Sequence, residues 1–144
     1  MRKISLFFLV ALFFIAIFCL TDAIGQREIV TETNYVFVCC FHDYSRSPRS
    51  LSIERYARDA VGEYFRNDLD SKKIIFKTIN VREKGYENYI DKYGLYNIKE
   101  SFVISLIKND KVVKYKSVTD LGKYSEEKHK FQEYVRNVIT EYLK

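Results

Sequence analysis

The feature that most constrains the fold is a continuous apolar run, YVFVCCF, at residues 35–41. It is rich in β-branched and aromatic residues and too short for a helix, so it predicts a β-strand. A strand with no polar alternation has both faces covered, which is typical of a central strand in a parallel sheet. The rest of the chain must therefore supply layers on both sides of this strand.

The segments that follow alternate between helical and strand patterns. Apolar residues between Ile53 and Phe65 recur at spacings of three and four, which predicts an amphipathic helix of about 18 residues. Residues 73–81 predict a second strand. Residues 83–93 repeat the helical spacing, and Gly94 follows as a helix stop.

The last part of the chain predicts a hairpin and a closing helix. Residues 101–107 form the third predicted strand, Asn109-Asp110 a two-residue turn, and residues 111–116 its antiparallel partner. Lysines alternate with valine and tyrosine in that partner, as on a sheet edge protected by charge. An amphipathic helix follows from about Glu126 to the end. The order β-α-β-α-β-β-α predicts the α/β class, with a central mixed sheet flanked by helices.

The N-terminus has the composition of an export signal. Arg2 and Lys3 precede an apolar run at residues 4–20, and Ala23-Ile24-Gly25 is a small-x-small cleavage pattern. We therefore interpret residues 1–25 as a signal peptide, either cleaved or kept as an N-terminal membrane anchor. The protein is expected to be periplasmic or secreted.

Behind the signal, the sequence predicts a flexible polar lead-in at residues 26–34 and a single domain at residues 35–144. The net charge of the chain is +5, and its basic residues are dispersed rather than clustered. With an export signal in front, this mild charge argues against nucleic-acid binding. The expected partner is another envelope or secreted protein.

Cys39 and Cys40 are the only cysteines behind the predicted signal, and they are adjacent. A disulfide between neighbours would close a strained ring, so no disulfide framework is predicted. Strand alternation directs Cys40 and His42 to one face and Cys39 with Phe41 to the other. Two ligands on one face fall short of the four that a structural zinc site needs. Both cysteines are therefore interpreted as small buried apolar residues, with no metal and no cofactor.

The segment Ser47-Pro48-Arg49-Ser50 has the spacing of a Cys-x-x-Cys motif with serine at both cysteine positions, and it opens the first long helix. This position resembles that of the redox motif in the thioredoxin family. DKYGLYNIKESFVISLI (91–107), the hairpin IKNDKVVKYKS and the strand end TINV resemble the same family.

Within that family, the chain resembles most closely the small exported bacterial thioredoxin-like proteins of the nitrophenyl-compound nitroreductase subunit ArsF type. These proteins have Phe-His before the motif, as Phe41-His42 here, and a similar lysine- and tyrosine-rich C-terminal helix.

The resemblance implies a thioredoxin-like fold without thioredoxin chemistry. Serine cannot form the mixed disulfide that thiol–disulfide exchange requires. The family places a cis-proline before the third strand, but the matching positions here are Glu100 and Ser101. A trans bond is expected there, because a cis bond without proline costs about 3 kcal/mol. The positions of the vestigial motif are Ser47, Pro48, Arg49, Ser50, Glu100 and Ser101.

The residues of the segment 47–50 are compatible with more than one role. Ser47 is a preferred N-cap and Pro48 suits the first helical position, so we favour a helix cap. An alternative is an anion-binding helix end, with Arg46 and Arg49 beside free N–H groups. A serine hydrolase site would need a histidine oriented by an acid, and His42-Asp43 stands without a nucleophile elbow or oxyanion loop.

The sequence thus predicts no catalytic residue and a redox-inactive, exported thioredoxin-fold domain. We expect it to bind its partner near the N-terminus of the first helix and the loop around Glu100-Ser101. The alternative is a thiol–disulfide oxidoreductase that uses Cys39 or Cys40.

Overall fold

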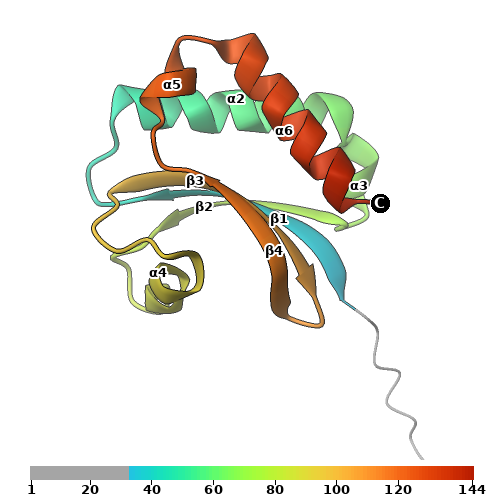
Figure 1. Ribbon diagram of the computed structural model, residues 1–144, viewed down its shortest axis with the longest axis horizontal. Helices are drawn as coiled ribbons and strands as arrows, with labels where there is room; N and C mark the ends of the chain where they lie inside the picture. Colours follow the sequence, from blue (N-terminus) through green and yellow to red (C-terminus); the bar gives the residue numbers. More distant parts are fainter. Residues whose placement is uncertain (1–32) are drawn as a thin grey trace, which may run out of the picture. The chain divides into compact units, whose positions relative to one another are not determined.

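The computed structural model describes residues 33–144, so the predicted signal peptide and nearly all of the predicted lead-in lie outside the described residues. The described part forms a four-stranded sheet with helices on both faces (Figure 1). The strand order is β2-β1-β3-β4. β1 runs parallel to β2 and antiparallel to β3, and β4 is antiparallel to β3. The predicted α/β class with a mixed sheet flanked by helices is confirmed.

The predicted order of strands and long helices is also confirmed. The strands are β1 (Asn34–His42), β2 (Ile74–Asn80), β3 (Glu100–Lys108) and β4 (Lys111–Val118). The helices are α2 (Pro48–Tyr64), α3 (Arg66–Asp70), α4 (Glu87–Tyr93), α5 (Gly122–Ser125) and α6 (Lys128–Tyr142). None of these helices is long and apolar enough to cross a bilayer.

β1 lies at the centre of the sheet and is buried on both faces, as its apolar run predicts. Its side chains alternate between two cores. Val36, Val38 and Cys40 pack with α2 and α6, whereas Phe37, Cys39 and Phe41 pack on the side of α4. The predicted separation of the two cysteines onto opposite faces is therefore confirmed.

The two cores differ in composition. α2 and α6 bury aliphatic side chains and Phe131 against one face. Of the helices within residues 33–144, α4 is the one that covers the other face (Figure 1), and it contributes mainly tyrosine rings. The rings of Tyr89 and Tyr93 are stacked with centroids 6.1 Å apart, and Phe41 lies 5.6 Å from Tyr93. Such offset aromatic contacts are the preferred geometry of ring pairs.

The hairpin between β3 and β4 follows from its turn residues. Asn109 and Asp110 have φ angles of 50° and 61°, as a two-residue type I′ turn requires. β4 is an edge strand, as its lysine pattern predicts. The pairing shifts between Leu106, opposite Lys114, and Ile107, opposite Val112, so Val113 forms a bulge.

One predicted helix boundary is wrong. The helix predicted at residues 83–93 begins at Glu87, because Gly85 has a φ of 99° and the preceding residues form turns instead. It ends at Gly94 in the left-handed conformation, as predicted. The last helix begins at Lys128, within two residues of the start expected at about Glu126. The short helices α3 and α5 were not predicted because they have little amphipathic pattern of their own.

Candidate functional site

Ser47 caps the N-terminus of α2. Its backbone is extended, with φ −72° and ψ 155°, and its hydroxyl oxygen accepts a hydrogen bond from the backbone N–H of Ser50 at 3.1 Å. Pro48 occupies the first turn, where a missing N–H leaves no hydrogen bond unmade. The predicted helix cap is confirmed.

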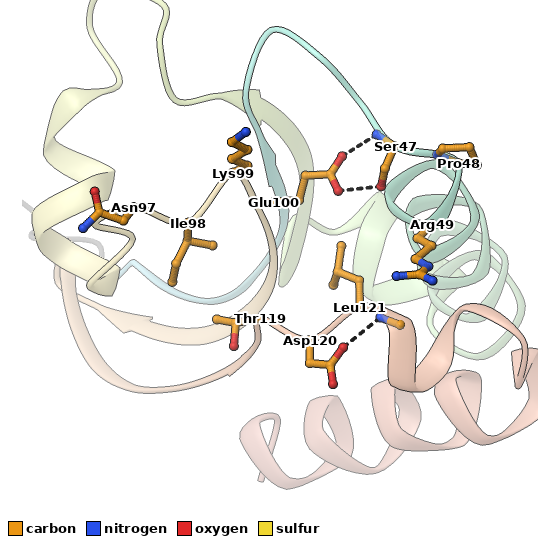
Figure 2. Close-up of a pocket in the computed structure, with 11 residues that line it drawn as sticks. Ser47, Pro48, Arg49, Asn97, Ile98, Lys99, Glu100, Thr119, Asp120 and Leu121 are labelled. Carbon is orange, nitrogen blue, oxygen red and sulfur yellow. Dashed lines mark hydrogen bonds between the residues drawn. The ribbon is translucent and has the colours of Figure 1, made fainter.

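Glu100 reaches the same residue from the start of β3. The backbone N–H of Ser47 donates to Glu100 Oε1 and its hydroxyl donates to Oε2, both at 2.5 Å. Figure 2 shows the two bonds side by side. His42, the last residue of β1, pairs with Glu100, so the sheet register brings the loop after β1 to this carboxylate. The Ser47 hydroxyl is therefore engaged as both donor and acceptor.

A pocket of about 660 Å³ opens beside this contact, and three segments line it (Figure 2). They are Ser47–Arg49 at the start of α2, 97–100 before and at the start of β3, and 119–122 after β4. Charged side chains of both signs contribute to the lining: Arg49 and Lys99 are positive, and Glu100 and Asp120 are negative. The pocket is larger than a single side chain and mixes polar with apolar surface, so it has room for a small ligand or for a segment of polypeptide.

The segment 119–122 is the part of the site that sequence reasoning missed. The backbone N–H of Gly122 donates to Asp120 Oδ1 at 3.1 Å, which forms a local turn. A Cβ at Gly122 would lie 3.1 Å from Asp120 Oδ1 and 3.5 Å from an Arg49 guanidinium nitrogen, so it would crowd the Asp120 carboxylate and make an ordinary contact with Arg49. Thr-Asp-Leu-Gly is recognisable as a turn in the sequence, but its position beside α2 depends on the tertiary fold.

Four of the six predicted site residues line the pocket, and two do not. Ser47, Pro48, Arg49 and Glu100 belong to the lining. Ser50 is 3% exposed and Ser101 is 2% exposed, and neither lines the pocket. Ser101 donates its hydroxyl to the carbonyl of Val118 at 3.4 Å. No peptide bond in residues 33–144 is cis, which agrees with the trans bond expected at Glu100 and Ser101.

Arg46 takes part in an ion-pair network rather than facing a free anion site. It pairs with Glu54 of α2, and Glu54 also accepts from Arg58 at 2.6 Å. Burial of the Glu54 carboxyl raises its pKa, but the hydrogen bonds from Arg58 and Arg46 outweigh this and hold the pKa below its usual value. Because Arg46 is paired and Ser47 caps the helix, the geometry disfavours the anion-binding alternative.

Cys39 and Cys40 are both free and buried. Burial raises the pKa of the Cys40 thiol to about 12, and burial is also the main cause that raises the pKa of Cys39. A thiolate is the reactive form, so both thiols are poor nucleophiles where they stand. Among residues 33–144, no group of three or more histidine, cysteine or acidic side chains is arranged to hold a metal ion.

His42 does not assemble a hydrolase site. Its ring N–H at Nδ1 donates to the backbone carbonyl of Asp43 at 2.6 Å and not to the Asp43 carboxylate. Ser47 donates its hydroxyl proton to Glu100, so no histidine is in position to accept it. The arrangement that a Ser-His-Asp mechanism requires is not formed by these residues.

Comparison with known proteins gives no family: no protein-family model and no curated protein matches this sequence.

Proposed function

We propose that this chain is an exported thioredoxin-fold protein that lacks the redox dithiol and serves as a non-catalytic binding or accessory domain in the cell envelope. The strand order β2-β1-β3-β4, the antiparallel β3 and β4, and the long helix directly after β1 support the fold. The apolar run at residues 4–20 supports export.

The contact between Ser47 and Glu100 carries the functional part of the proposal. A redox motif at this helix end would need a free thiolate at the first position. Here that position is serine, and the Glu100 carboxylate accepts from both its N–H and its hydroxyl. A carboxylate at this place would also repel a thiolate. The helix end is therefore built as a fixed structural contact, and the pocket beside it remains open for a partner.

The partner that suits this pocket is another envelope or secreted protein. The lining comes from three chain segments and carries positive and negative side chains, among them Arg49, Lys99 and Asp120. Mixed charges with backbone groups between them favour a polypeptide over a uniformly charged nucleic acid.

The enzyme alternative is a thiol–disulfide oxidoreductase that uses Cys39 or Cys40. An insulin-reduction assay on the full chain, kept in solution with a mild detergent, separates the two functions. We expect no catalysis above the uncatalysed rate. Catalysis that Cys40→Ser or Cys39→Ser abolishes would overturn the binding proposal.

Restoring the dithiol tests the role of Glu100. We expect Ser47→Cys/Ser50→Cys to gain at most weak insulin reduction, because the nearby carboxylate disfavours the thiolate. Adding Glu100→Gln should increase that activity, and Asp120→Asn, which neutralises another carboxylate of the same pocket, is the matched control. A double variant that is fully active with Glu100 in place would contradict this role of the carboxylate.

Site-specific photocrosslinking tests the binding surface. A crosslinking amino acid is placed at Lys99 or Thr119 in the pocket, or at the exposed Glu63 on α2 as a control, and the full chain is mixed with its own envelope extract. We expect both pocket positions to capture the same protein, and an excess of unlabelled chain to prevent this capture. The crosslinker at position 63 should not capture that protein. Equal capture from all three positions would contradict a site at this pocket.

A further inference from the structure

β2 is an edge strand without the protection that β4 has. Within residues 33–144 no strand pairs with its outer side. Its sequence, IIFKTIN, contains one lysine and no proline, and it pairs with β1 in unbroken register from Ile74 to Asn80. β4 carries several lysines and a bulge. Exposed edges without such features accept additional strands.

The hydrogen bonds to β1 show which backbone groups of β2 point outward. Val36 N–H donates to the carbonyl of Lys73 at 2.8 Å, and Val81 N–H donates to the carbonyl of His42 at 3.0 Å. In a parallel pair, the backbone groups of every second residue bond to the same neighbouring strand. The backbone N–H and C=O groups of the odd-numbered residues of β2 therefore point to β1. The N–H and C=O groups of Phe76 and Thr78 therefore point to the open edge.

A hollow of about 80 Å³ lies on the α4 side of this strand. Tyr35, Phe37 and Tyr89 supply aromatic walls, Ile75 adds an aliphatic side chain, and Lys77 and Lys92 complete the charged part of the lining. Both lysines are exposed, and neither forms an ion pair within residues 33–144. The hollow is far smaller than a pocket for a drug-sized ligand, which is at least about 300 Å³, and has room for one side chain.

We propose that the β2 edge and this hollow together bind an extended, acidic segment of a partner protein. The segment adds a strand to β2 through the outward groups of Phe76 and Thr78. Residues two apart on a strand share a face, so one aromatic side chain enters the hollow while acidic residues on either side of it meet Lys77 and Lys92.

The positive charge of the hollow indicates which kind of segment binds there. Lys77 and Lys92 present two cations that have no ion-pair partner among residues 33–144, which complements an acidic segment. A second copy of the chain is the poorer occupant, because pairing two β2 edges would bring Lys73 and Lys77 of both copies to one seam. This surface shares no residue with the pocket at Ser47 and Glu100, so it stands independently of the function proposed there.

The probe is the heptapeptide Thr-Glu-Thr-Phe-Thr-Glu-Thr-amide with a fluorescein label on its N-terminus, into which the full chain is titrated in mild detergent. We expect saturable binding, with the peptide that has lysine in place of glutamate about tenfold weaker. Methylation of alternate backbone nitrogens of the peptide should abolish binding, because it removes the strand hydrogen bonds. Hydrogen exchange at the amides of Phe76 and Thr78 should be fast in the free chain and slow once the peptide is bound.

Three variants test the residues. Lys77→Glu/Lys92→Glu should weaken the acidic peptide about tenfold and improve the lysine peptide. Thr78→Pro removes an outward N–H without removing a bond to β1 and should abolish binding of either peptide. Lys111→Glu on the opposite edge is the control and should change nothing. Melting midpoints report whether each variant folds. If Thr78→Pro does not fold, Lys77→Glu/Lys92→Glu still tests the proposal.

The proposal is overturned if no saturable binding occurs up to about 1 mM peptide, or if both peptides bind equally. It is also overturned if the amides of Phe76 and Thr78 are protected before any peptide is added. Concentration-dependent protection would then mean that a second copy covers the edge, and concentration-independent protection that the chain's own residues 26–32 do.

Discussion

The two faces of the sheet are covered to different extents and by different side chains. On one face α2 and α6, 17 and 15 residues long, bury aliphatic side chains and Phe131. On the other face α4 has only seven residues, and its main contacts are tyrosine rings, of which Tyr89 is half-buried.

The face covered by α2 and α6 contributes more to stability, whereas the face covered by α4 leaves more surface available to partners. Free energy from burial scales with the apolar area removed from water, and the α2 and α6 side removes more of it. The α4 side leaves an aromatic hollow beside β2, whose outer side pairs with no strand of residues 33–144; a fully covered face would not offer such a hollow. Stability measurements on each face can test this division.

The largest effect is expected for Phe131→Ala. Phe131 is fully buried, and its ring makes an edge contact with Phe102 at a centroid distance of 5.0 Å. The change should lower the free energy of unfolding by about 3–5 kcal/mol, as for other buried phenylalanines. Urea denaturation followed by circular dichroism measures it. A loss below about 2 kcal/mol would contradict the assignment of the main core to this face.

Tyr89→Ala on the other face should cost less, about 2 kcal/mol, because the ring is only half-buried although it contacts Phe37, Phe41 and Tyr93. The same urea titration applies. Val113→Ala, at a 56% exposed position, is the control and should have almost no effect. If Tyr89→Ala destabilises the chain as much as Phe131→Ala, the two faces contribute equally and the comparison fails.

Glu54→Gln tests the ion pairs that Arg46 and Arg58 make along α2. The pKa of Glu54 is lowered in the folded chain, so its ionised form stabilises the fold. That contribution is complete above the ordinary pKa of 4.5 and is lost as the pH falls through the lower folded value. We expect a loss of about 1–2 kcal/mol at pH 7 that disappears in acid. A difference between wild type and variant that does not change with pH would contradict the role of the charge.

The smallest effect is expected for Ser47→Ala, which removes the cap of α2 together with the hydroxyl's hydrogen bond to Glu100 and should cost about 1 kcal/mol. Ser47→Asp keeps a capping side chain but places a second carboxylate beside Glu100, so it should not restore full stability. Ser52→Ala, within the same helix, is the matched control. Thermal melting of the three variants is sufficient, and an unchanged midpoint for Ser47→Ala would contradict the importance of the cap.

Much of the secondary structure could be predicted because its causes are local. A serine before proline begins α2, Asn109-Asp110 adopts the positive φ angles of a tight turn, and Gly94 ends α4. The start of α4 could not be predicted from apolar spacing alone, because Gly85 and the turns around it interrupt the helix without breaking that spacing.

The candidate site was predictable only in part. Strand alternation placed Cys39 and Cys40 on opposite faces, and the helix cap identified Ser47. The same local signals could not separate Ser50 and Ser101, which are buried, from the residues that line the pocket.

By itself the sequence determined the order of elements, the buried central strand and the serine that starts the long helix, because these depend on periodicity and on hydrogen bonds between near neighbours. Only the tertiary structure decided that Glu100 bonds to Ser47 across 53 positions and that residues 119–122 complete the pocket. It also decided that β2 is an edge strand of the sheet that residues 33–144 form. These contacts depend on which strands pair and in which register, and that choice is made by the packing of the whole domain.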